Sequence, residues 1–505
     1  MAVVLVVALV LLSAALLSPG LLIGPSLDAA VFNHVAGRML DGVPLYLGTW
    51  DHKPPGIYLA TAAARAILGW VGPWTAEWLL SVAATAGIGL AVAATLSGLG
   101  VTGRPRALAA AGAVALAGQY LLALGGGLSE PLATALVALA LLGALRPAGR
   151  LQMARVGVLL GGALLISPQV LPGVLAIAAL GLAGVPAASR LPRLALLAVG
   201  AAVPIAGAAA WLAISGALPA ALDAVIGYTA AYRAASADYG VMLGAPVAAW
   251  TLLTCLFLIA PAILGAISLS RPAAPKRRVV VASLVWIAGS AVLVLVQGRF
   301  YAHYAIPLAV PLGVLAGYGL ARMRELLVRA RSTGGRAVAV APGVVALAIS
   351  LVAATATTTT LIAPMAHQAG QMAAVSAWIR GLPAGSGGML VWGNQPHLYE
   401  LAGQEPAIRF SYLYPLTTPG YATPTLIAEV RSDLAGSPPS VIVDAGSDAP
   451  GAPGFLPLLV SRPVAREGRD LDLLDPLRTF VAEHYQLATV VDGWPIYLLT
   501  AGPAS

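Results

Sequence analysis

A short run of residues near the start of the chain combines charged side chains that suit group-transfer chemistry. Residues 45–59 read LYLGTWDHKPPGIYL and place Asp51, His52 and Lys53 side by side before two prolines. An earlier acid, Asp28, lies in the same polar stretch. A carboxylate can accept the proton of an attacking hydroxyl group, and a cation can stabilise a phosphate leaving group. We therefore expect Asp28 to act as a base and Lys53 to contact phosphate.

The composition of the chain shows what surrounds these residues. Of 505 residues, 59% are hydrophobic and only 10% are charged, and the mean hydropathy is +0.87. Soluble proteins contain roughly 25% charged residues. Long apolar runs such as 279–296 and 337–351 approach the length that spans a bilayer. The chain is therefore predicted to be a polytopic α-helical membrane protein, and its single cysteine, Cys255, excludes an intramolecular disulfide.

Apolar runs of suitable length predict about 11 membrane spans. The predicted spans are residues 2–24, 75–98, 107–124, 128–145, 153–166, 168–185, 194–214, 241–269, 279–297, 305–321 and 337–361. The first of them lacks the basic start and the cleavage site of a signal peptide, so we expect it to be retained.

The connections between these spans alternate in charge. One set holds 16 of the 28 basic residues and a single acid, Glu325, whereas the opposite side holds the other basic residues and 19 of the 20 acids. Basic loops stay in the cytoplasm, so the N-terminus is predicted inside and the C-terminal tail outside a cytoplasmic (inner) membrane. Because this asymmetry explains the net charge of +8, the basic residues do not indicate nucleic acid as a partner, and contact with anionic membrane lipids is secondary.

The first outer loop, 25–74, is predicted to contain interfacial helices. Residues 56–69 are apolar but reach only about 21 Å as a helix, short of the roughly 30 Å hydrocarbon core. The segment around Val31, Val35 and Met39 has helical periodicity, which is typical of an amphipathic helix on the membrane surface. A plain interfacial anchor with a solvated face is one reading of this loop, and His34 is expected to be solvated.

Charged residues and turn-forming residues become frequent beyond the last predicted span. We therefore divide the chain into a transmembrane domain, 1–361, and an extracytoplasmic domain, 362–505. Three segments of the second domain predict strands, the last of them folded around an Asp-Gly turn. They are GMLVWG, SVIVDAG and LATVVDGWPIYLLT. Helical segments alternate with them, which predicts a small α/β domain.

The first outer loop resembles that of the C-type membrane glycosyltransferases, in the bacterial branch related to protein O-mannosyltransferases and the lipid A aminoarabinose transferase. The resemblance lies in Asp28 after the first span, in Gly42 with Tyr46, and in DHKPP at 51–55. Weaker similarity extends over 125–136, 297–312 and 391–412. Such enzymes take sugars from a polyprenyl-phosphate carrier outside the membrane. Asp28 is followed by Ala29, where the family often has a second acid, so no role is given to that position.

Several further residues are candidates for the site, each with a plainer alternative. Glu130 is either an active-site acid or a helix cap. Asp51, His52 and His303 could bind a divalent metal ion, although they are distant in sequence and the first two could simply be surface residues.

Cations and aromatic residues in later outer loops are also candidates. Arg299 and Tyr304 are expected at the donor phosphate, with a snorkelling arginine as the alternative. Tyr228, Tyr232 and Arg233 either bind the donor or belong to the aromatic belt of the membrane.

The resemblance implies a hexosyl- or pentosyltransferase that uses a polyprenyl-phosphate-sugar donor. The acceptor, a lipid, a cell-wall glycan or a protein, is not specified, and we expect direct, inverting displacement. A transporter or flippase is the alternative, but it predicts ionisable residues near the middle of the membrane, where almost none occur. A structural protein with an outer binding domain would not explain the acid-rich loop before KPP.

Overall fold

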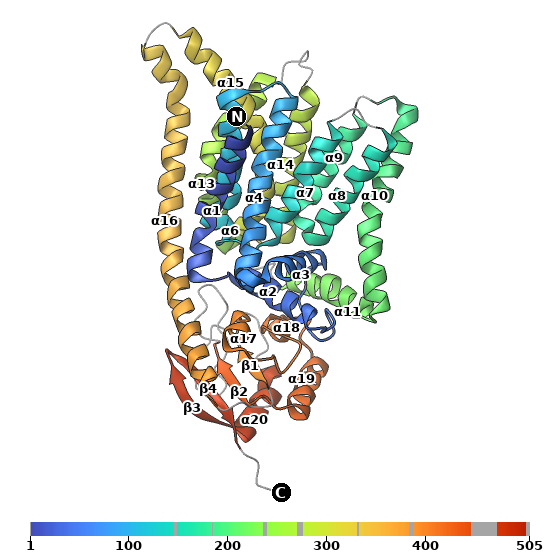
Figure 1. The fold of residues 1–505 in the computed structure, drawn as a ribbon, viewed down its shortest axis with the longest axis vertical. Coiled ribbons are helices and arrows are strands. Elements are labelled where there is room, and N and C mark those ends of the chain that lie inside the picture. Colours follow the sequence, from blue (N-terminus) through green and yellow to red (C-terminus); the bar gives the residue numbers. More distant parts are fainter. Residues whose placement is uncertain are drawn as a thin grey trace.

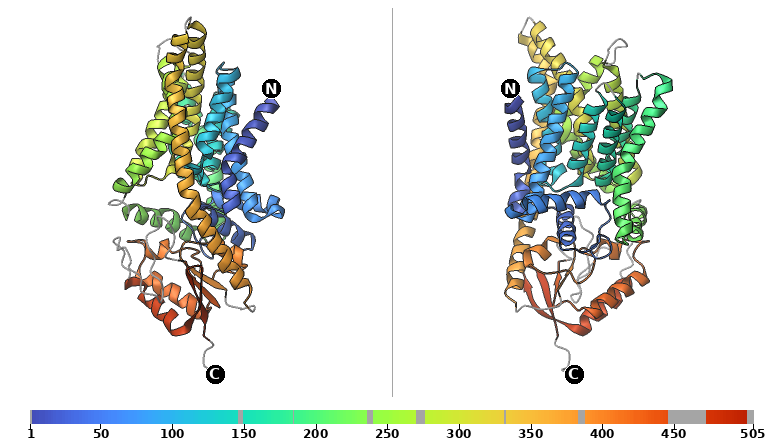
Figure 2. Two further views of the ribbon diagram at one scale, coloured as in Figure 1. Left: turned by 90° about the vertical axis from the view of Figure 1, so that its left-hand side faces the viewer. Right: turned by 45° about the vertical axis from the view of Figure 1, so that its right-hand side comes forward.

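The centre of the molecule is a bundle of apolar helices that run along its long axis and alternate in direction (Figures 1 and 2). The computed structural model describes residues 2–145, 149–183, 185–235, 240–269, 276–330, 333–382, 388–445 and 472–500. The bundle helices are α1 (Ala2–Ile23), α4 (Pro73–Gly98), α5 (Gly103–Gly118), α7 (Ser129–Ala144), α8 (Arg150–Ile166), α9 (Leu171–Leu182), α10 (Ala187–Ile214), α13 (Gly240–Leu269), α14 (Arg277–Gln297), α15 (Ala309–Arg329) and α16 (Thr333–Arg380).

Length and composition agree with a membrane-spanning bundle. Within the described residues, 7 helices are long and apolar enough to cross a membrane. Helices α7, α8 and α9 are apolar but shorter, with 16, 17 and 12 residues. The predicted polytopic helical fold is confirmed, whereas the number of spans and the direction of insertion stay predictions. The helix that contains the last predicted span is longer than that span, since α16 continues to Arg380 without interruption.

Two helices of the predicted first outer loop lie across one end of this bundle. They are α2 (Leu27–Leu40) and α3 (Gly56–Leu68), the latter followed by the short η1 (Gly69–Val71). The expected solvated face of α2 is absent, since Ala29 through Gly37 are all buried. The prediction that His34 is solvated is wrong: its ring is 4% exposed and lies 5.2 Å from the ring of Tyr399. Packing against the C-terminal part of the chain covers the face that would otherwise meet water.

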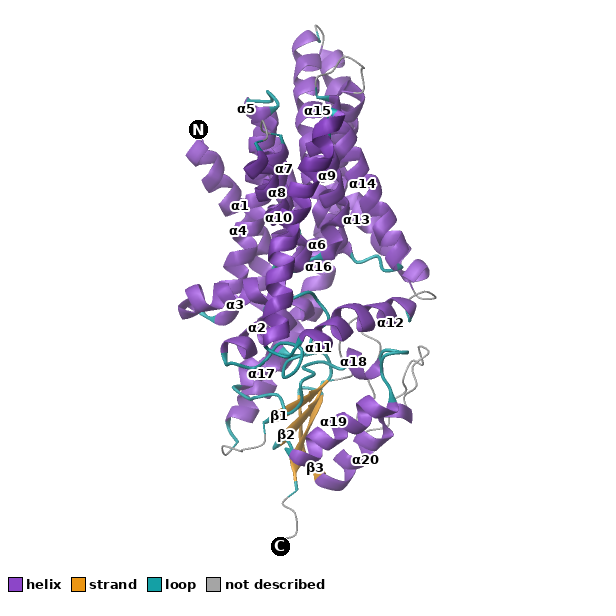
Figure 3. Cartoon of the chain, turned by 90° about the vertical axis from the view of Figure 1, so that its right-hand side faces the viewer, coloured by secondary structure: helices purple, strands orange, loops and turns teal. Residues whose placement is uncertain are grey.

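Several short helices gather between the bundle and the C-terminal part (Figure 3). They are α6 (Tyr120–Ala123), η2 (Pro168–Val170), α11 (Leu218–Leu222), η3 (Asp223–Tyr228), α12 (Thr229–Ala234) and η4 (Ala302–Leu308). The η3 segment is a π-helix, a local geometry that is frequent at functional sites.

A four-stranded sheet forms the C-terminal part, with strand order β1-β2-β4-β3. Strands β1 (Met389–Trp392) and β2 (Val441–Asp444) are parallel, and β3 (Tyr485–Val491) and β4 (Trp494–Leu499) form an antiparallel hairpin. The predicted Asp-Gly turn joins the hairpin, with φ of 48° at Asp492 and 90° at Gly493. Helices of this part are α17 (His397–Ala402), α18 (Tyr414–Thr417), α19 (Pro424–Gly436), η5 (Asp472–Leu474) and α20 (Asp475–His484).

The sheet-containing part packs directly onto the loop helices. The backbone N–H of Trp50 donates to the carbonyl of Arg409 at 2.9 Å, and Arg65 on α3 forms an ion pair with Glu400 on α17. One cluster of buried apolar residues extends from the bundle through Trp50 to Phe410. The proposed division after residue 361 falls inside α16 and stays a prediction.

Candidate active site

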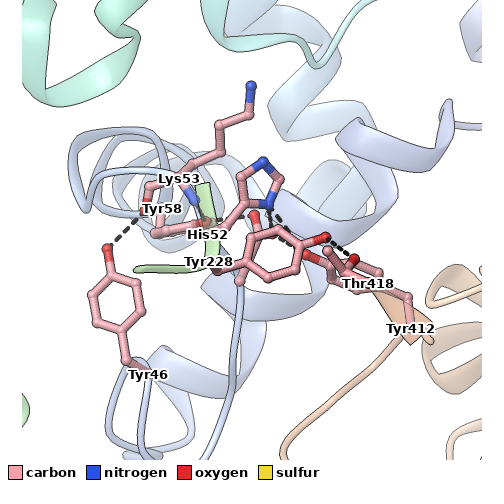
Figure 4. Close-up of polar contacts among 8 residues, drawn as sticks. Tyr46, His52, Lys53, Tyr58, Tyr228, Tyr412 and Thr418 are labelled. Carbon is pink, nitrogen blue, oxygen red and sulfur yellow. Dashed lines mark hydrogen bonds and ion pairs between the residues drawn. The ribbon is translucent and has the colours of Figure 1, made fainter. Parts of the chain in front are cut away.

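The segment that contains Asp51 to Lys53 is held by hydrogen bonds rather than by regular secondary structure. The hydroxyl of Tyr46 donates to the carbonyl of Lys53 at 2.8 Å, and the N–H of Lys53 donates to the hydroxyl of Tyr58 at 3.2 Å (Figure 4). Tyr46 itself has φ of 67°, and its N–H donates to the carbonyl of Thr49 at 2.7 Å. Two tyrosines therefore fix the backbone of Lys53.

The carboxylate of Asp51 lies inside this network and is 2% exposed. The hydroxyl of Tyr58 donates to Oδ2 at 2.5 Å, and the hydroxyl of Tyr412 donates to Oδ1. Burial alone would raise the pKa of Asp51, but the charge of His52 and hydrogen bonds from His52, Tyr412 and Tyr58 lower it to about 2. Asp51 is therefore an ionised group whose two oxygens are already bonded to protein donors.

This carboxylate orients the imidazole of His52. Nδ1 of His52 lies 2.9 Å from Oδ1 of Asp51. An ionised carboxylate only accepts hydrogen bonds, so Nδ1 carries the proton and Nε2 is the second ring nitrogen. Figure 4 shows that nitrogen on the side of the ring away from Tyr412, the side to which the ammonium of Lys53 also points. The His52 ring packs 5.2 Å from the ring of Tyr228.

A cavity of about 370 Å³ opens beside these residues. It lies where α2, the 51–53 segment, η3, α12, η4 and the chain before α18 meet. Its polar and aromatic lining consists of Ser26, Asp28, Phe32, Asp51, His52, Lys53, Tyr228, Tyr232, Tyr301, His303, Tyr304, Tyr412 and Tyr414. Segments that are more than 350 residues apart in sequence therefore share one site.

Asp28 and Lys53 face this cavity from neighbouring elements. Asp28 lies in the first turn of α2, whose N-cap is Ser26. Burial alone would lower the pKa of Lys53, but the carboxylates of Glu130 and Asp28 outweigh it and hold the pKa above its ordinary value. A partly buried ammonium that stays charged is suited to contact an anion, because less water competes for it than at the open surface.

Glu130 lies behind the cavity, in the first turn of α7, and is 1% exposed. Its Oε1 accepts hydrogen bonds from the hydroxyl of Ser129 at 3.1 Å and from that of Ser167 at 3.2 Å. The structure thus brings Glu130 close enough to influence Lys53, although it is not among the residues that line the cavity.

The later candidates divide into those at the cavity and those beside it. His303, Tyr304, Tyr228 and Tyr232 line it. The guanidinium of Arg299 lies 3.8 Å from the ring centre of Tyr232, a cation–π contact. The structure does not bring Arg233 to the site: its side chain is exposed on α12.

The predicted metal set does not assemble into a ligand cluster. Among the described residues, no group of three or more His, Cys, Asp and Glu side chains is placed to hold a metal ion. Asp51, His52 and His303 all face the cavity, but both oxygens of Asp51 and Nδ1 of His52 are engaged with protein groups. The donors present therefore do not fit a metal centre.

Sequence reasoning expected the C-terminal part to shape acceptor binding but did not identify the residues that it contributes to the cavity. Tyr412 and Tyr414 line the cavity, and the hydroxyl of Thr418 donates to that of Tyr228 at 3.3 Å. The local signals were the weak resemblance over 391–412 and the alternation of Phe410, Tyr412 and Tyr414, which is typical of any partly buried extended segment. Neither signal indicates a partner near residue 51.

Comparison with known proteins identifies the fold. No protein-family model matches the chain, and no curated protein matches its sequence. The structure of ArnT from Cupriavidus metallidurans bound to undecaprenyl phosphate aligns with a TM-score of 0.58 and 14% identity over 100% of this chain and 99% of that chain. ArnT in the apo state gives a TM-score of 0.53 and 13% identity over 95% of each chain. The oligosaccharyltransferase of Archaeoglobus fulgidus, in complex with Zn and sulfate, gives 0.46 and 14% over 87% of this chain and 67% of that chain. The ArnT alignments show that the chain has the C-type membrane glycosyltransferase fold, as expected.

Proposed function

We propose that this protein transfers one sugar from a polyprenyl-phosphate-linked donor to an acceptor outside the cytoplasmic membrane. The observation that carries the proposal is the cavity in which the acid of Asp28 and the partly buried ammonium of Lys53 face the same space. Aromatic rings around that space suit a sugar ring, whose C–H groups pack on aromatic faces. The ArnT structure with the same fold was solved with undecaprenyl phosphate, which agrees with a lipid-phosphate donor.

The reaction would be a direct, inverting displacement of a hexosyl or pentosyl unit. The acceptor hydroxyl attacks the anomeric carbon, the bond from that carbon to the phosphate oxygen breaks, and the lipid phosphate leaves. Asp28 receives the proton of the hydroxyl, and the ammonium of Lys53 stabilises the charge that grows on the phosphate. A new glycosidic bond replaces the phosphate ester, so the bond count and the charge balance.

Arg299 and the tyrosines near it would bind the donor on the other side of the cavity. Its Nη1 donates to the hydroxyl of Tyr301 at 3.0 Å, and the hydroxyls of Tyr232 and Tyr301 are 2.8 Å apart. These contacts hold the guanidinium beside the cavity, where Tyr304 also lies. Fixed donors of this kind lower the reorganisation needed when the phosphate charge develops.

The decisive experiment is transfer of a labelled sugar from a synthetic polyprenyl-phosphate donor into membranes of the native host. Asp28→Asn should reduce the transfer rate about 100-fold or more, because a general base contributes about that factor. Asp41→Asn is the matched control, since Asp41 caps the other end of α2 and is outside the cavity lining. Equal rates for the wild type and Asp28→Asn would refute the assignment of Asp28 as base.

The same assay distinguishes transfer from transport. A transporter or flippase would move the donor without forming a sugar–acceptor bond, so no labelled product would appear in any variant. A chelator arm tests the metal hypothesis directly: if transfer stops on chelation and returns with a divalent ion, a metal takes part despite the engaged side chains.

A further inference from the structure

A second cavity lies at the end of the bundle that points away from the sheet. It is a groove of about 440 Å³ between α9 and α14. Its apolar walls come from one face of each helix, at the i, i+3, i+4 and i+7 spacing of a helical stripe. The wall residues are Ala176, Ala179 and Leu180 on α9, Ala183 directly after it, and Val281, Ala282 and Val285 on α14.

One end of this groove is strongly basic. Arg277 and Arg278, at the start of α14, line it, and among the described residues that line it none is acidic. Both arginine side chains are exposed. Nη1 of Arg278 donates to the carbonyl of Ala183 at 3.1 Å, which fixes that guanidinium at the mouth of the groove while its remaining N–H groups stay available.

The groove opens toward the lipid-facing side of the bundle. Val281 and Val285 are each 49% exposed, and α14 is one of the helices long and apolar enough to span a membrane. An occupant therefore meets apolar walls at the depth of acyl chains and two guanidiniums at the depth of head groups. A water-soluble anion would bind the two arginines but would not contact the apolar walls.

From this charge and shape complementarity we infer that the groove binds one anionic glycerophospholipid, with its phosphate at Arg277 and Arg278 and an acyl chain along the alanine-lined walls. Basic residues at the membrane surface attract anionic lipid. Guanidinium groups pair with phosphate through parallel hydrogen bonds. The site is separate from the Asp28 cavity and does not depend on the proposed transfer reaction.

Native mass spectrometry of the full-length protein tests the site, with dioleoylphosphatidylglycerol and dioleoylphosphatidylcholine as probes. Wild type should retain one phosphatidylglycerol with about tenfold or greater preference over phosphatidylcholine. The double variant Arg277→Gln/Arg278→Gln should lose that preference. The control Arg190→Gln/Arg193→Gln removes the same charge near the start of α10, outside the groove lining, and should behave as the wild type.

A second variant tests the groove apart from the charge. Ala179→Phe should fill the apolar wall and weaken binding of phosphatidylglycerol, with thermal unfolding confirming that the variant is folded. Retention of phosphatidylglycerol by the double glutamine variant would overturn the proposal, and so would unchanged binding by Ala179→Phe. Preferential binding of undecaprenyl phosphate in competition would also overturn it, because the occupant would then be the wrong lipid.

Discussion

The carboxylate of Asp51 accepts hydrogen bonds from Tyr58, Tyr412 and the ring of His52. These three donors keep it ionised and make it an orienting group for His52, rather than a free acid or a metal ligand. Because Tyr412 comes from the C-terminal part, the geometry of His52 depends on how that part is seated. The orientation of His52 at the cavity therefore depends on how the C-terminal part packs against the 51–53 segment.

Removal of one of these donors should have a measurable effect. Tyr412→Phe deletes a hydrogen bond to a charged group, so we expect the free energy of unfolding to fall by about 1.5 to 3 kcal/mol. The transfer rate should fall about tenfold, because His52 loses part of its support. Chemical unfolding and the transfer assay measure the two effects.

Tyr421→Phe is the matched control for this substitution. Its hydroxyl donates to Oδ2 of Asp223 at 2.6 Å in a more exposed position, so the loss should be below about 1 kcal/mol. If both variants lose the same unfolding free energy and the same fraction of the transfer rate, the contact between Tyr412 and Asp51 contributes no more than the exposed contact of Tyr421.

The site residues that could be predicted from the sequence are mainly those that lie next to one another in it. Asp51, His52 and Lys53 are adjacent, and their residue types together with those of Asp28 and His303 indicated a shared site, which the structure places at one cavity. The state of Asp51 could not be predicted, because the donor Tyr412 is 361 residues away. Long-range pairs of this kind have no local pattern.

At the scale of single elements, α2 separates two environments. Asp28 and Phe32 face the candidate active site, whereas His34 and Arg38 face a smaller polar pocket against α17. Arg38 forms an ion pair there with Glu405. Helical spacing assigns the two sets to different faces, so one helix connects the cavity to the C-terminal part.

His34 should make this contact sensitive to acid. Burial, followed by the charges of Arg38 and Arg65, lowers the pKa of His34 to about 3, against about 6.5 for an unperturbed histidine. Between these values the unfolded chain binds the proton and the folded chain does not. Stability is therefore fully present above about pH 6.5 and is lost as the pH falls toward 3, by about 2 kcal/mol between pH 6.5 and 5.

The measurement is the unfolding free energy of detergent-solubilised protein between pH 7 and 5. His34→Gln should have a flatter pH dependence than the wild type, since it removes the titrating group. His367→Gln, at an exposed position of α16, should retain the wild-type slope. Identical slopes in all three proteins would show that His34 does not titrate across this transition.

Elements with a strong local pattern were predicted well. The strands around residues 389–392 and 441–444 and the final hairpin lie where alternation and the Asp-Gly turn placed them. Helices α17 and α18, with 6 and 4 residues, are too short to leave a periodic signal. The continuity of α16 from the last predicted span to Arg380 was not predicted, because a membrane-spanning helix can continue in water and helical periodicity does not mark that boundary.

At the scale of the whole molecule, the helix ends that carry described basic residues of these connections, such as the start of α5 and the start of α14, lie at the end of the bundle opposite the sheet (Figure 1). The sheet, the loop helices and the cavity lie together at the other end, joined by one apolar cluster. The distribution of basic residues along the chain was sufficient to predict which connections lie together at one end of the bundle. It could not show that the C-terminal part closes the cavity, because that depends on tertiary packing.

The orientation of this arrangement in the membrane follows from the same charge bias and can be measured with a membrane-impermeant maleimide. Cys255 is 4% exposed, and its replacement by alanine gives a background without native thiols. In that background Ser437→Cys, an exposed position after α19, should be labelled in intact spheroplasts. Thr102→Cys, an exposed position before α5 at the opposite end, should be labelled only after lysis.

This labelling pattern is expected because basic loops are retained in the cytoplasm, which leaves the cavity and its sheet outside. The reverse labelling pattern would place Asp28 and Lys53 in the cytoplasm, where a nucleotide-activated sugar could be the donor, and the proposed use of a lipid-linked donor outside the membrane would fail.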